Sequence, residues 1–235
     1  MNSIDIGWCI SEEISSSVFF PPITAAFDSP LHENKKKDGV SSCPAVHSAE
    51  KNIFIIKSPY SIRLRARTVS EGKISIFPIY PQTEVQEEII SSLILIEPRD
   101  YWIQDQVPVI QIKMPYLFFS DSPAWVSQLE TTSLKKNKNW SLIQGRFDIY
   151  NWQRPLSFAI QWLDINEDIA IKRGDPIFQL MFDSDQACNK FKLRRVELHE
   201  TLIRRINSCS GVNQLIRNTN KVINNNRDEN ITLVQ

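Results

Sequence analysis

The sequence is poor in the residue types on which many catalytic and metal sites depend. Its 235 residues include six glycines, three histidines and four cysteines. So few glycines leave little material for a glycine-rich loop around phosphate groups, and so few histidines leave little for a histidine-based metal site. The cysteines are far apart and form no CxxC pair, which excludes a zinc ribbon and argues against a disulfide framework in a chain of this length. The sequence therefore predicts no metal site and no cofactor.

The sequence also lacks net charge and long apolar runs. Lys and Arg number 27 and Asp and Glu number 27, so the formal net charge is zero. This balance argues against a main role in binding nucleic acid or an anionic membrane. No apolar run approaches the ~20 residues that a membrane-spanning helix needs. Residues 1–13 hold acidic but no basic side chains, so we expect no secretory signal peptide.

Apolar residues are plentiful, and in the central part of the chain they follow the two-residue period of β-strands. Hydrophobic residues make up 42% of the chain, enough for a sizeable core. Residues 61–67 put apolar side chains on one face and Arg63, Arg65 and Arg67 on the other, which indicates a half-buried strand. With residues 73–77 this strand predicts a hairpin. Further strands are expected at residues 53–56, 107–114, 116–119, 145–150, 156–162, 169–171 and 177–182.

The chain divides into four segments by composition. We expect a loop-rich segment at residues 1–51, a β-domain at 52–183, a helical extension at 184–226 and a flexible tail at 227–235. Residues 193–206 have the three- and four-residue spacing of an amphipathic helix, and a second helix is expected after Gly211. Residues 84–106 fit either helix or strand. The fold class is therefore predicted to be mainly β, a β-sandwich or open barrel with a C-terminal pair of α-helices.

One part of the predicted β-domain, residues 145–182, combines glycine, aspartate and arginine in a fixed order. It holds Gly145-Arg146-Phe147-Asp148, then Arg154-Pro155-Leu156, then a turn and strand from Arg173-Gly174-Asp175-Pro176 to Phe182. This order resembles the trimeric dUTPase and dCTP deaminase group. The resemblance implies a dUTPase-like β-fold, with Asp148 in the place of the catalytic aspartate that activates water. The sequence departs from that group at Ser61, where the group has an aspartate, and it lacks the group's glycine-rich C-terminal arm.

A second resemblance covers residues 43–215 and depends on the order of short motifs along the chain. The motifs are Cys43-Pro44, Ser58-Pro59-Tyr60, Pro115-Tyr116, Asp121-Ser122-Pro123, Gly145-Arg146-Phe147, Trp152, Arg154-Pro155-Leu156, Trp162 and Arg173-Gly174-Asp175-Pro176. As a set they resemble a family of uncharacterised proteins frequent in tailed phages, especially marine phages and cyanophages. The resemblance implies a phage source, and hence a location in the host cytoplasm or the virion. It implies no activity.

Tryptophan and arginine side chains recur through the same motifs. Together they stack and bind anions, so with the arginines of residues 63–67 they would form a basic, aromatic groove. In the alternative, the tryptophans pack in or near the core and the arginines pair with Asp148, Asp164 and Asp175. The candidate ligand-binding residues are Tyr60, Arg146, Trp152, Arg154, Trp162, Arg173 and Asp175.

Two hypotheses about function follow. In the first, the protein is a phage-encoded binding or structural protein without enzymatic activity, because no complete catalytic set is present. Its partner would be a protein: its own copies in a homo-oligomer, a virion component or a host protein. In the alternative, it is an enzyme that processes a nucleotide or small anion, with Asp148 as the base and Arg146, Arg154 or Arg173 holding the anion. Convergence of Asp148, Arg154 and Arg173 on one cleft would favour the enzyme.

Overall fold

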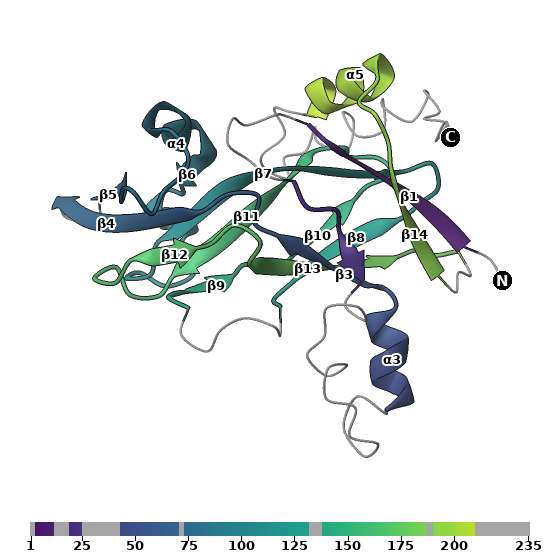
Figure 1. Ribbon diagram of the computed structural model, residues 1–235, viewed down its shortest axis with the longest axis horizontal. Coiled ribbons are helices and arrows are strands. Elements are labelled where there is room, and N and C mark those ends of the chain that lie inside the picture. The colour runs from purple at the N-terminus through teal and green to yellow at the C-terminus, as the bar shows by residue number, and fades with distance from the viewer. Residues whose placement is uncertain are drawn as a thin grey trace.

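A computed structural model describes residues 3–11, 19–24, 43–70, 73–131, 138–186 and 190–209 (Figure 1). About half of these residues belong to three β-sheets, which confirms the predicted mainly β class. The six-stranded sheet has the order β14-β1-β7-β11-β9, with β6 also paired to β7. Its strands are β1 (Ser3–Ile10), β6 (Ile94–Ile96), β7 (Val109–Ser120), β9 (Trp140–Leu142), β11 (Pro155–Trp162) and β14 (Lys190–Arg195).

The two other sheets are built from strands of the predicted β-domain and one short N-terminal strand. The five-stranded sheet has the order β10-β8-β13-β3-β2, and the three-stranded sheet has the order β12-β4-β5. The five strands are β2 (Ile23–Thr24), β3 (Ile53–Lys57), β8 (Trp125–Leu129), β10 (Gly145–Asp148) and β13 (Pro176–Asp183). The three strands are β4 (Ile62–Ser70), β5 (Lys73–Pro78) and β12 (Ile169–Ile171). The predicted hairpin over residues 61–77 is thus confirmed by β4 and β5.

The main core lies between the six-stranded and five-stranded sheets. In β11 every second residue is buried, from Leu156 to Trp162, because alternate side chains of a strand point to the same face. Phe158 of β11 packs against Phe178 of β13 with ring centroids 5.8 Å apart. Phe118 of β7 packs against Phe182 of β13, also at 5.8 Å. These aromatic contacts hold the two sheets face to face.

Strand β7 is longer than the sequence predicted. Two separate strands were expected, at residues 107–114 and 116–119, one on each side of Pro115. The structure has one strand of 12 residues instead. No residue of β1, β6 or β11 is registered opposite Pro115, so its missing N–H leaves the ladder intact.

Both ends of the described chain differ from the sequence prediction. Residues 3–10 were expected to be irregular, but they form β1, which lies between β14 and β7. Residues 193–206 were expected to be one helix, but β14 continues to Arg195 and the helix α5 (Glu200–Cys209) begins later. β14 is selected as a strand because it pairs in parallel with β1 over six residues and buries Phe191. The expected second helix and the tail lie outside the described residues.

Short helices complete the fold. They are α3 (Pro44–Glu50), α4 (Glu87–Leu93), the 3₁₀ turn η2 (Arg99–Tyr101) and α5. Residues 84–106, which fitted either helix or strand, form both: α4, then β6 paired to β7, then η2. Helix α5 covers the outer face of the six-stranded sheet, where Leu202 packs with Cys9, Leu117 and Phe119 in a second, smaller core (Figure 1).

Candidate functional site

Asp148, the candidate catalytic residue, holds the turn that follows β10. Its Oδ1 accepts hydrogen bonds from the backbone N–H groups of Tyr150 (3.1 Å) and Asn151 (2.9 Å). Its Oδ2 accepts a third bond, from the side-chain amide of Asn151, at 2.7 Å. This is the pattern by which aspartate stabilises a turn. Both oxygens of the carboxylate are therefore engaged within the turn's own residues.

Tyr60 and Trp162 lie in the core rather than on a surface. Tyr60 is 1% exposed and Trp162 is fully buried. The Tyr60 hydroxyl donates to the carbonyl of Lys113 at 3.1 Å, and the Trp162 indole donates to the carbonyl of Glu167 at 3.0 Å. Burial raises the pKa of the Tyr60 phenol above its usual value. Each polar group is satisfied by backbone, as buried polar groups usually are.

The remaining candidates are held in separate sets of contacts. Arg146 of β10 pairs with Asp183 of β13, and its guanidinium lies 4.7 Å from the ring centroid of Trp125. Arg154 lies over the ring of Trp152, at 5.0 Å. These two pairs belong to different segments, one on the five-stranded sheet and one on the connection between β10 and β11.

Arg173 and Asp175 belong to the turn before β13. Arg173 pairs with Glu84, and its backbone N–H donates to the Ser61 hydroxyl at 3.1 Å. Asp175 accepts a hydrogen bond from the backbone N–H of Lys172 at 3.0 Å. Gly174 has φ +82°, a conformation that glycine adopts at least cost, so the predicted tight turn is confirmed. Asp148, Arg154 and Arg173 thus each have partners of their own.

The arginines of β4 are also engaged. Arg63 and Arg65 both donate to Asp168, each with an Nε–Oδ distance of 2.8 Å. Hydrogen bonds from Arg65 and then Arg63 hold the pKa of Asp168 below its usual value. Arg67 lies over the ring of Phe77, at 5.6 Å. The three arginines of this strand are therefore each partnered by a side chain of the protein itself, an acid or an aromatic ring.

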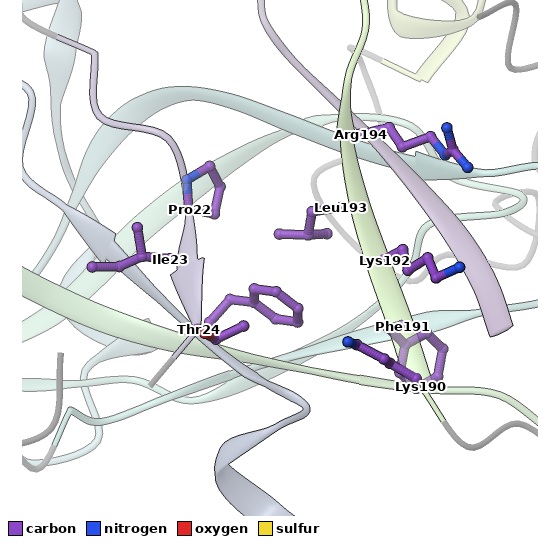
Figure 2. A pocket seen from close by; sticks show the side chains of 9 residues that line it. Pro22, Ile23, Thr24, Lys190, Phe191, Lys192, Leu193 and Arg194 are labelled. Carbon is purple, nitrogen blue, oxygen red and sulfur yellow. The ribbon is translucent and has the colours of Figure 1, made fainter. Parts of the chain in front are cut away.

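An open groove lies elsewhere, between the edge strands of the two large sheets. β2 ends the five-stranded sheet and β14 ends the six-stranded sheet. Between them is a cavity of about 590 Å³, within the usual size range of ligand pockets. Figure 2 shows β2 on one side and β14 on the other, with Leu193 pointing into the space between them. The lining residues are Pro22, Ile23, Thr24, Phe54 and residues 190–194.

Aromatic packing fixes the floor of this groove, which we call the β2–β14 groove. Phe182 of β13 contacts Phe54 with ring centroids 5.5 Å apart and Phe191 of β14 at 6.0 Å. All three side chains are buried. They join β3, β13 and β14, so the two edges are held at a fixed separation by the core.

The sequence also explains why the β2 side is short. Pro21 and Pro22 precede the strand, and proline confines strand pairing to edges. β2 therefore pairs with β3 through only Ile23 and Thr24. The segment before it is fixed at Phe20, whose N–H donates to the Tyr116 hydroxyl (3.2 Å) and whose carbonyl accepts from it (3.0 Å). Burial raises the pKa of Tyr116 to about 12.

Positive charge accompanies the β14 side. Four of the six residues of β14 are cationic. Arg194 pairs with Asp5 of β1, with an Nε–Oδ2 distance of 2.8 Å, whereas Lys192 has no ion pair with any described residue. In Figure 2, Lys190 extends toward the β2 side, while Lys192 and Arg194 extend from the opposite side of β14. The groove thus combines an apolar interior with a basic edge.

The described residues lack a metal-site cluster and a membrane-spanning helix. No group of three or more His, Cys, Asp or Glu side chains gathers there as a metal site would require. None of the helices in that part of the chain has both the length and the apolar character needed to cross a membrane.

No protein-family model fits the sequence, and no curated protein is similar to it. The groove must therefore be interpreted from its own residues.

The sequence prediction missed the groove because residues 193–206 were assigned to a helix. A signal was present: Lys190-Phe191-Lys192-Leu193-Arg194 alternates cationic and apolar residues over five positions, which is the period of a strand.

Proposed function

We propose that this protein acts by binding, and that the β2–β14 groove holds an extended segment of a protein partner. The observation that carries the proposal is the combination of an apolar groove with a basic sheet edge. Exposed apolar grooves rimmed by polar residues are typical of interaction sites. The accessible lining is aliphatic, from Ile23 and Leu193, and the aromatic rings below are buried, so the groove suits aliphatic side chains better than a stacked base.

Charge indicates which protein surface fits the groove. Two copies of β14 brought together would oppose eight cationic side chains, and like charges across a strand pair are destabilising. At this groove the partner is therefore a different segment, with acidic groups. If the chain comes from a tailed phage, as the order of its motifs suggests, such a segment would belong to a virion component or a host protein. We also propose a phage origin and a location in the host cytoplasm or the virion.

Hydrolysis of a nucleotide in a dUTPase-like fold is the less favoured alternative. It would need the Asp148 carboxylate to activate water, and that carboxylate already accepts three hydrogen bonds within its turn. The alternative can be tested by melting temperature in the presence of dUTP or dCTP with Mg²⁺. A ligand at a hundredfold excess over its Kd stabilises a protein by about 2.7 kcal/mol. A rise in melting temperature that corresponds to this stabilisation would favour the enzyme hypothesis.

The proposed function is tested by selecting peptides from a random displayed library on the immobilised full chain. We expect the selected peptides to combine aliphatic and acidic residues. Lys192→Glu should weaken their binding by about tenfold or more, since it reverses charge at the groove. Leu193→Ser should also weaken it, in a variant whose melting temperature confirms folding.

The matched control is Lys73→Glu, the same charge change at the exposed start of β5. It should leave binding within about twofold. Selected peptides that bind the Lys192→Glu and Leu193→Ser variants as tightly as the original chain would contradict the assignment of the groove.

A further inference from the structure

We propose that the partner's segment joins the six-stranded sheet as an added strand along the outer edge of β14, with acidic and apolar residues in alternation. This inference rests on the proposed function of the β2–β14 groove. It adds the mode of binding, which is main-chain pairing, and the residue pattern of the segment that binds.

The backbone of β14 supplies the first part of the argument. One edge of β14 pairs in parallel with β1 over six residues, and no strand among the described residues pairs with its other edge. In a strand, N–H and C=O groups point toward both neighbours, so the outer edge carries backbone groups that no described strand pairs. The groove is lined by five consecutive residues, Lys190 to Arg194. Consecutive residues line a strand's edge, whereas every second residue lines a face.

Among the described strands, β14 is also the only long edge at the groove. β2 has two residues and follows two prolines, so it cannot support a ladder of normal length. β14 has six residues, close to the usual strand length of about five or six. A segment entering the groove therefore pairs with β14 and lays side chains toward β2.

The side chains of β14 specify the pattern. Phe191 and Leu193 face the groove floor and core, Lys192 and Arg194 project from the opposite side of the strand, and Lys190 extends toward β2. Residues opposite one another in neighbouring strands share a face, and opposite charges there attract. The added strand therefore places apolar side chains beside Phe191 and Leu193, filling the space toward Ile23, and acidic side chains beside the cations.

Edge lysines often serve another purpose, since natural sheets use them to prevent unwanted strand pairing. That purpose does not require a cavity of about 590 Å³ beside the edge. A protected edge next to an apolar groove rejects basic or neutral strands and accepts acidic ones. The cations of β14 thus supply specificity as well as protection.

The test uses the full chain and labelled peptides of about seven residues that alternate Val and Glu, read by fluorescence anisotropy. A peptide that alternates Val and Lys is the charge control. Two further Val/Glu peptides are N-methylated, one at the odd and one at the even amides. N-methylation removes hydrogen-bond donors from one edge of an extended peptide and leaves its side chains in place.

We expect the Val/Glu peptide to bind and the Val/Lys peptide to bind about tenfold or more weakly. One N-methylated peptide should lose binding by about tenfold or more while the other retains it, because only one edge of the added strand faces β14. Lys192→Glu should weaken the Val/Glu peptide, and Lys73→Glu should not.

The outcomes separate the two proposals. If both N-methylated peptides bind like the parent and Lys192→Glu still weakens binding, the added-strand inference is overturned and the groove remains the binding site. If the Val/Glu peptide binds and neither N-methylation nor Lys192→Glu changes its affinity, both proposals fail. If the Val/Glu peptide does not bind at all while library peptides bind the groove, the alternating pattern is wrong.

Discussion

Strands β4 and β14 carry the same alternation of cationic and apolar side chains, yet they occupy opposite situations in the fold. β4 is the inner strand of its sheet, paired with β12 on one side and β5 on the other. Its Arg63 and Arg65 both donate to Asp168. β14 is an edge strand beside an open groove, and its Lys192 has no ion pair with a described residue.

The comparison shows that a row of cations is a poor guide to a binding site by itself. The arginines of β4 already contact an acid and an aromatic ring within the fold. Charge becomes available to a partner where the strand's backbone edge is open too. The two strands can therefore be set against each other by experiment.

The largest expected effect on stability comes from the turn between β12 and β13, beside β4. Gly174 has φ +82°, which a β-branched residue adopts only with strain. We expect Gly174→Val to lower the free energy of unfolding by about 1–3 kcal/mol, or about 2–4 °C in melting temperature per kcal/mol for a chain of this size. Gly174→Asn should cost less, because asparagine tolerates positive φ better. An unchanged melting temperature for the valine variant would show that the turn is not strained.

Asp148 sharpens the distinction between acids that serve the fold and groups left for a partner. Asp148→Ala removes the acceptor of three hydrogen bonds, so we expect a loss of about 1–3 kcal/mol in stability and unchanged affinity for groove peptides. Asp148→Asn, which keeps one acceptor oxygen, should lose less. Chemical denaturation measures the first effect and fluorescence anisotropy the second. Full stability combined with loss of a nucleotide-dependent activity would instead identify Asp148 as a catalytic residue.

Substitution of Asp168 tests directly whether the β4 arginines are held in ion pairs. Its pKa is lowered in the folded protein by Arg65 and Arg63, so its contribution to stability is present above its unfolded pKa of about 3.9 and disappears as the pH falls through the lower folded value. We expect Asp168→Asn to cost about 1 kcal/mol or less at neutral pH and nothing at the lowest pH. A stability difference that persisted in acid would contradict the ion pair. Groove-peptide binding at β4 in this variant would break the comparison.

Asp5 gives the smallest effect, on the open region. Its carboxylate pairs with Arg194 and so neutralises part of the basic edge. Asp5→Asn should raise the affinity of an acidic peptide by about two- to threefold at low salt, whereas Asp168→Asn should leave it unchanged. A lower affinity in the Asp5 variant would show that this pair positions the edge rather than masks it.

Much of the fold could be predicted because its signals are local. The β4–β5 hairpin, the strands at β11 and β13 and the turn at Gly174 follow from alternation and from a short run of turn residues. The pairing of β1 with β14 could not be predicted in the same way. They pair with each other across nearly the whole chain, from Ser3 to Lys190, and no local pattern records a partner so distant.

The candidate site was harder to predict than the fold. The sequence singled out residues by type, and the structure places Tyr60 and Trp162 in the core and engages Arg146 and Arg173 with acids. The groove depends on two edges meeting, which is a property of topology. Only the alternation at Lys190 to Arg194 signalled it, and the spacing of the apolar residues that follow favoured a helix there.

Hydrogen exchange, measured by mass spectrometry on the full chain with and without the Val/Glu peptide, tests the contrast between β14 and β4 most directly. If the open edge of β14 receives an added strand, amides of residues 190–195 should exchange more slowly with peptide present, while those of residues 62–70 should not change. Slower exchange in β4, or unchanged exchange in β14 at saturating peptide, would contradict the account.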